Sequence, residues 1–150
     1  MSLSDWQKNG WLVEHRATPR EISGLRAAVD RDLKVCATPE LDTDWRFNIA
    51  YNAALQTATM ALAAAGYRAV REMHHFRVIH SLSFSIGADA ALIDLLDRFR
   101  KKRNIGTYEQ AGVVSNYETE EMHRLAKTLR EQVLTWIGRT HPDLIENKDI

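Results

Sequence analysis

The feature that most constrains the fold of this chain is the scarcity of residues that interrupt helices. Its 150 residues include only three prolines and seven glycines. Apolar and polar residues nowhere alternate over a sustained run, which is the pattern of a half-buried strand. The sequence therefore predicts an all-α fold, an up-and-down helical bundle of about five to six helices without strands.

Length and composition indicate a single domain over residues 1–150. Hydrophobic residues make up 45% of the chain and charged residues 27%, which is too apolar for a disordered protein. Twenty basic residues balance twenty acidic ones, so a role in nucleic-acid binding has to rest on a local patch. No apolar run is long enough for a signal or membrane-spanning segment, and the lone Cys36 falls on an apolar helical repeat. We therefore expect a cytoplasmic protein with no membrane contact and a buried thiol.

Capping signals and apolar spacing place the expected helices. Thr18 and Pro19 mark a helix start, and Gly66 suits the left-handed position that ends a helix. The third helix is rich in alanine, so its neighbours should approach it closely. The expected helices cover about residues 5–15, 19–36, 42–66, 70–84, 88–106 and 116–138, with a tail over 142–150.

A polar ladder of Asp44, Asn48, Asn52 and Gln56 runs along the third expected helix. Residues four apart share one face of a helix. The ladder is either the solvated face of an amphipathic helix or, at Asn48 or Asn52, part of a polar site between helices.

The most informative stretch lies at the end of the fifth expected helix. Leu92, Leu96 and Phe99 form an apolar stripe, and the next step of four along the same face is Arg103. A guanidinium on a buried face needs a carboxylate partner, a set of hydrogen-bond acceptors or an anionic ligand. Arg103 is therefore the first candidate site residue.

Arg103 and Asn104, at the end of a helix in a small bundle, resemble the motif of HEPN domains (higher eukaryotes and prokaryotes nucleotide-binding). In that motif an arginine and a polar residue are followed four to six positions later by a histidine. Here Tyr108 stands in the histidine position. The resemblance covers a core of about residues 42–137, with residues 4–37 as a helical extension and residues 142–150 as a tail.

The resemblance implies a homodimer that binds RNA or a nucleotide, and a metal-independent ribonuclease of toxin-antitoxin or defence type without a cofactor. It implies a nucleotidyltransferase-type antitoxin partner as well. Arg103 would bind phosphate, Asn104 would orient it and Tyr108 would donate a hydrogen bond, as catalytic residues. Arg100, Lys101, Lys102 and Asn52 are the expected RNA-binding residues. Because a phenol is a weaker base than an imidazole near neutral pH, Tyr108 leaves RNA cleavage as a hypothesis.

Two alternatives remain at this point. The chain could be a catalytically inactive dimerisation or partner-binding module, in which Arg103 forms a buried ion pair with Asp94, Asp97 or a carboxylate of another helix. It could also be a di-iron carboxylate bundle, because Glu72 with His75 and Glu120 with His123 have the required spacing. Glu120, however, falls opposite the apolar stripe of its helix and should face solvent. We therefore expect no metal site.

Overall fold

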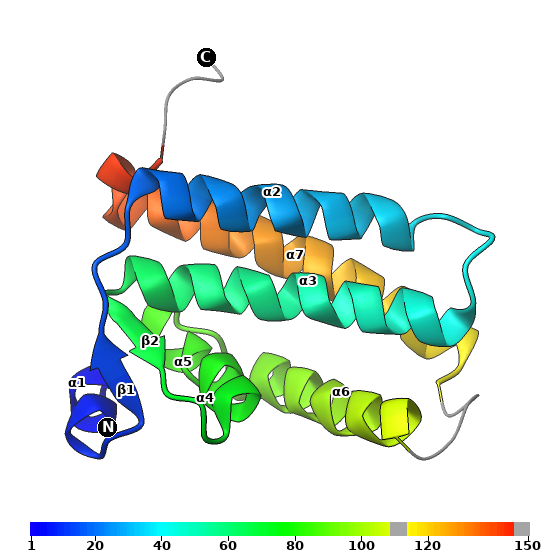
Figure 1. Ribbon diagram of the computed structural model, residues 1–150, viewed down its shortest axis with the longest axis horizontal. Coiled ribbons are helices and arrows are strands. Elements are labelled where there is room, and N and C mark those ends of the chain that lie inside the picture. The colour runs from blue at the N-terminus through cyan, green and yellow to red at the C-terminus, as the bar shows by residue number, and fades with distance from the viewer. Residues whose placement is uncertain (109–113, 146–150) are drawn as a thin grey trace.

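Helix α3 (Thr43–Ala64) runs through the middle of the molecule (Figure 1). In the computed structural model, residues 1–108 and 114–145 are described, apart from the side chains of residues 104–108. Helices α2 (Pro19–Cys36) and α7 (Asn116–Thr140) pack on one side of α3. The other side contacts the short helices α4 (His74–His80) and α5 (Leu82–Ser85) and the longer α6 (Ala90–Tyr108). The protein is an all-α helical bundle, as predicted.

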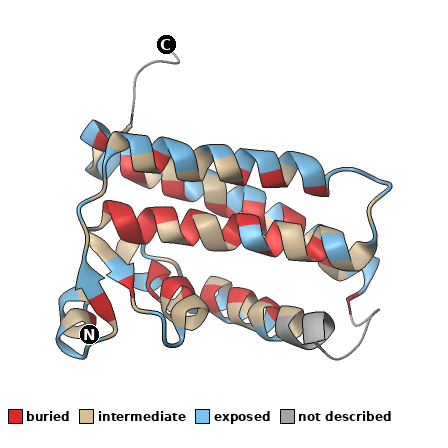
Figure 2. Ribbon diagram, in the orientation of Figure 1, coloured by how far each residue is buried: buried red, intermediate tan, exposed pale blue. Residues whose placement is uncertain are grey.

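The sequence of α3 explains its central position. Alanines occupy much of its buried surface, which Figure 2 shows as the most continuous red stretch of any helix. Small side chains let neighbouring helices approach, and larger ones fill the remaining space. Phe47 packs edge to face on Phe99 of α6, with ring centroids 5.4 Å apart. The prediction of a slim central helix is confirmed.

Two short strands join the N-terminal segment to the end of α3. Strand β1 (Leu12–Glu14) follows α1 (Leu3–Lys8) and pairs antiparallel with β2 (Tyr67–Ala69), with Leu12 opposite Ala69. Gly10 has φ +81° and ends α1, while Gly66 has φ +100° and turns the chain back after α3. The predictions of a helix up to residue 15, of a helix from residue 70 and of a chain without strands are therefore wrong.

The remaining helix boundaries follow local capping. The Thr18 hydroxyl accepts a hydrogen bond from the Glu21 amide at the start of α2, as predicted. Ser115 and Glu118 form a reciprocal capping box at the start of α7. A 3-10 turn (Pro142–Leu144) follows α7, and Cys36 is 1% exposed, which confirms its place in the core. Within the described residues, no helix combines the length and apolarity needed to cross a membrane.

Candidate functional site

Arg103 lies on the buried face of α6, as its spacing predicts. Leu96 and Phe99 on the same face are fully buried. The Arg103 guanidinium carbon lies 5.2 Å from the centroid of the Tyr51 ring on α3, within cation–π distance. Its Nε is buried and has no hydrogen-bond partner. The half-buried side chain therefore carries a hydrogen-bond donor that the fold leaves unused.

The other basic residues of this segment are neutralised by carboxylates. Asp97 accepts from Arg100 Nε at 2.8 Å and lies 3.5 Å from Lys101 Nζ, while Lys102 Nζ donates to Glu118 at 2.7 Å. Burial raises the pKa of Asp97, but the Arg100 hydrogen bond and the surrounding cations outweigh it and lower that pKa. Arg103 forms no ion pair with any residue that the structure describes. Its positive charge is thus the uncompensated one of the four.

Tyr51 connects Arg103 to a histidine on α4. The Tyr51 hydroxyl lies 3.4 Å from His75 Nδ1. Burial raises the pKa of Tyr51 to about 12, so the phenol stays protonated. Burial lowers the pKa of His75, and the neighbouring Arg103, His74 and Arg100 lower it further. The imidazole is therefore neutral at neutral pH, and three helices bring Arg103, Tyr51 and His75 together.

His75 also lines an open surface pocket of about 360 Å³. Its other lining residues are Arg71, Met73, His74, Phe76 and Arg100, so this lining contains basic and aromatic groups and no carboxylate. Met73 has φ 53°, the left-handed conformation that non-glycine residues rarely adopt, and it immediately precedes α4. A pocket with this lining suits an anion that carries a planar group.

The structure does not bring Asn52 to this cluster. Its amide donates to Asp32 Oδ2 of α2 at 2.9 Å, and the Gln56 amide donates to the same oxygen at 2.8 Å. Part of the polar ladder thus converges on a buried carboxylate between helices. The side chains of Asn104 and Tyr108 lie outside the described residues.

Sequence reasoning missed Tyr51, His74 and His75 as members of a site. Tyr51 follows Phe47 by four residues on α3 and therefore looked like one more core aromatic. From the sequence alone, His74 and His75 are expected to be core or surface histidines, and His75 also pairs with Glu72 in the di-iron alternative. The one sequence signal for their role is the run of Arg71, His74 and His75 after the turn at Gly66.

The four residues of the hypothetical di-iron site do not face one common position in the bundle core. The Glu120 side chain is 48% exposed and accepts from Arg46 at 2.6 Å, which confirms that it faces away from the core. His123 is buried, and Glu72 is exposed. In the part of the chain that the structure describes, no three His, Cys, Asp or Glu side chains are grouped so that they could hold a metal ion.

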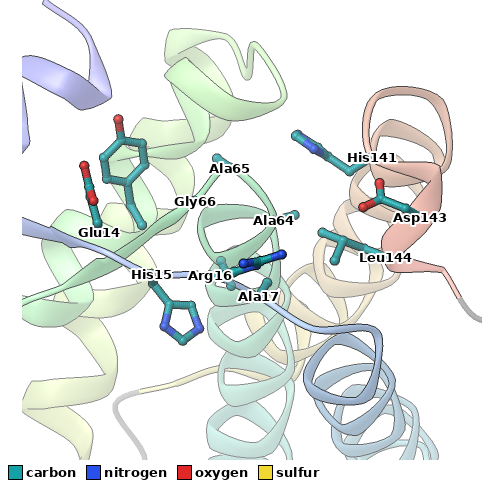
Figure 3. Close-up of a pocket in the computed structure, with 12 residues that line it drawn as sticks. Glu14, His15, Arg16, Ala17, Ala64, Ala65, Gly66, His141, Asp143 and Leu144 are labelled. Carbon is teal, nitrogen blue, oxygen red and sulfur yellow. The ribbon is translucent and has the colours of Figure 1, made fainter.

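Another pocket, of about 620 Å³, lies at the C-terminal end of α3 (Figure 3). Figure 3 shows Arg16 beside the last turn of α3, with His141 and Asp143 across from it and Glu14 at the far edge. The lining mixes both signs of charge and contains none of the candidate site residues predicted from the sequence. It does not select one class of ligand.

Comparison with protein-family models, with curated proteins and with solved structures finds no match to this chain. The resemblance to HEPN domains therefore stays a prediction from the residues around Arg103.

Proposed function

We propose that this chain binds RNA through phosphate contacts at the cluster of Arg103, Tyr51 and His75. The observation that carries the proposal is the Arg103 guanidinium, which has no carboxylate partner among the described residues and keeps a buried Nε unpaired. A guanidinium offers planar, paired donors that match a phosphate group. A phosphodiester bound beside this half-buried side chain would supply the missing negative charge.

The surroundings of Arg103 support RNA over a small inorganic anion. Arg71, His74 and Arg100 extend N–H donors along one side of the cluster, and Phe76 adds an aromatic ring to the pocket lining. Proteins that recognise single-stranded RNA combine phosphate contacts with aromatic or guanidinium surfaces on which bases stack. The overall neutral charge of the chain makes this local patch the site of contact.

The test compares two variants that each remove one positive charge from the same helix end. Wild-type protein, Arg103→Ala and Lys102→Ala are incubated with total RNA and with tRNA in EDTA, and retention is read on a gel. We expect Arg103→Ala to weaken binding roughly tenfold or more, since a charged hydrogen-bonded contact is lost. Lys102 is already paired with Glu118, so its removal should change binding by less than about threefold.

Equal losses in both variants would show that the charge of the helix end acts without a defined site. Wild-type protein that retains no RNA would overturn the proposal.

From the resemblance to HEPN domains, we also propose that the chain forms a homodimer of toxin-antitoxin or defence type. A nucleotidyltransferase-type protein would be its antitoxin. Light scattering of the purified chain tests the dimer, and co-purification with the products of neighbouring genes tests the partner. A monomer at micromolar concentration would remove the homodimer from the proposal.

The second candidate function is a dimerisation or partner-binding module without catalysis. Two large aromatic side chains favour it, because Trp45 is 62% and Tyr117 is 70% exposed. Trp45 lies in the first turn of α3 and Tyr117 in the first turn of α7. These two helix starts lie close together, near the end of α6 (Figure 1), and the Thr43 hydroxyl of α3 donates to Asn116 of α7 at 2.6 Å. Exposed tryptophan and tyrosine are enriched at protein interfaces. If Trp45→Ser and Tyr117→Ser leave the oligomeric state and RNA binding unchanged, this candidate fails.

A further inference from the structure

We infer that His75 is the general base of a metal-independent RNA cleavage at the Arg103 site, with Tyr51 as its positioning residue. The inference rests on the proposed RNA binding. It supplies from α4 the imidazole that is absent from the segment after Arg103, where Tyr108 stands. The assignment comes from the packing of α3, α4 and α6 around one buried phenol.

Tyr51 contacts one nitrogen of His75, and the proposed role requires the other nitrogen to carry the free lone pair. Its hydroxyl lies 3.4 Å from Nδ1, and its high pKa keeps it a neutral phenol whose oxygen can accept a hydrogen bond. When Nδ1–H donates to that oxygen, the lone pair lies on Nε2, the nitrogen directed away from Tyr51. Tyr51 is held in turn by burial, at 1% exposure. The contact orients the ring, and the proposed role assigns to His75 the tautomer in which Nδ1 carries the proton.

The charges around His75 keep it ready to accept a proton. Arg103 and Arg100 face it from α6, His74 faces it from its own helix, and Tyr51 faces it from α3. Burial, the two arginines and His74 disfavour the imidazolium. No carboxylate figures among the groups that act on the ring. His75 is therefore unprotonated at neutral pH, which is the form that a general base needs.

The reaction follows from these positions. His75 Nε2 removes the proton of a ribose 2′-hydroxyl while the 2′-oxygen forms a bond to the adjacent phosphorus. The bond from phosphorus to the 5′-oxygen breaks, and that oxygen leaves with a proton taken from water. The products are a 2′,3′-cyclic phosphate and a 5′-hydroxyl end. Arg103 stabilises the negative charge that builds up on the non-bridging phosphate oxygens, so no metal ion is required.

The test compares His75→Asn with a matched histidine variant away from the site, His141→Asn. A mixed-sequence single-stranded RNA and its all-2′-O-methyl counterpart are incubated with each protein in EDTA across a range of pH. We expect wild type and His141→Asn to cleave only the RNA, leaving cyclic phosphate ends, with a rate that falls in acid. His75→Asn should cleave about 100-fold more slowly and bind RNA as wild type does. Its cleavage rate should no longer fall at acid pH, so the acid limb of the pH–rate profile should be lost.

Tyr51→Phe tests the positioning role separately. It keeps the ring under Arg103 and removes only the hydroxyl that orients His75. We expect slower cleavage, unchanged RNA retention and a shifted acid limb, which a merely structural role would not produce.

The outcomes separate this inference from the proposed function. Wild-type protein that retains RNA without cleaving it overturns the role of His75 and leaves RNA binding standing. Protein that neither binds nor cleaves overturns both. Cleavage by folded His75→Asn at the wild-type rate, with the acid limb unchanged, rejects His75 as the base. Urea unfolding of each variant identifies any that fails to fold, and Tyr51→Phe then serves as the second test.

Discussion

The two sides of α3 treat their buried polar groups differently. Toward α2 and α7, Asp32 accepts from Asn52 and Gln56, and Arg46 donates to the Cys36 carbonyl and to Glu120. Toward α4, α5 and α6, several buried polar atoms of the described residues have no hydrogen-bond partner, among them Arg77 Nε, Ser85 Oγ and Arg103 Nε. His123 Nε2 on α7 is an exception to this division. On the first side the polar groups are hydrogen-bonded to one another, whereas on the second side several buried donors and acceptors have no partner among the described residues.

The unpaired side is also where the cations rest on aromatic rings. The Arg77 guanidinium lies 3.7 Å from the ring centroid of Trp11, and Arg103 lies over Tyr51. A ring stabilises a cation without using its N–H donors. Each unpaired buried donor costs about 1–3 kcal/mol. The cation–π contact thus positions the arginine side chain, and N–H donors such as Arg103 Nε stay without an acceptor.

The largest expected effect concerns the paired side. Asp32→Ala leaves the amides of Asn52 and Gln56 without their shared acceptor, and we expect the free energy of unfolding to fall by about 3 kcal/mol. The neighbouring Asp30→Ala serves as the control, because Asp30 is half exposed and pairs with Arg130 at the surface. It should cost less than about 1 kcal/mol. Urea unfolding measures both, and equal losses would contradict the distinction.

Two half-buried arginines give the most direct contrast between the sides. Arg46→Gln removes hydrogen bonds of 2.9 and 2.6 Å, so we expect a loss of about 2 kcal/mol. Arg103→Gln removes an unpaired buried donor and should leave stability unchanged or raise it by up to about 1 kcal/mol. Chemical denaturation of the two variants side by side reports the sign. A loss above about 2 kcal/mol for Arg103→Gln would mean that Arg103 serves the fold.

The histidines make stability depend on pH. Burial is the main cause that lowers the pKa of both His75 and His123. The unfolded chain therefore takes up protons first, and the free energy of unfolding falls as the pH drops below about 6.5. We expect His75→Asn to reduce this slope between pH about 7 and about 5, above the range in which carboxylates titrate. An identical slope in the variant, measured by thermal unfolding across that range, would contradict the shift.

The smallest expected effect concerns backbone strain before α4. Met73 is 52% exposed and holds φ at 53°. Met73→Gly relieves the strain at the cost of a more flexible unfolded chain, so we expect a net gain of about 0.5 kcal/mol. Met73→Ala keeps the strained conformation and should give no gain. Thermal melting of both variants separates them, and a loss of stability in Met73→Gly would contradict strain as the cause.

How much could be predicted from the sequence depended on how far apart the interacting residues lie along the chain. Helices α2 and α3 were placed well because the cap at Thr18 and the turn at Gly66 act locally. Arg103 was recognised because its charge breaks the pattern of its own helix. The strands were missed, since three residues carry little pattern and their pairing joins β1 to a segment beyond α3. His75 was missed for the same reason, because its surroundings come from Tyr51 and Arg103 on other helices.

The small β1–β2 ladder has a consequence for the order of folding. It pairs residues separated by the whole of α2 and α3, so its formation must close a long loop, which is entropically unfavourable in an open chain. Helices α2 and α3, joined by a short connection, meet far more readily. We therefore expect the ladder to form after this hairpin has collapsed. Because β2 leads directly into the segment before α4, we expect the contact between His75 and Tyr51 to form late in folding.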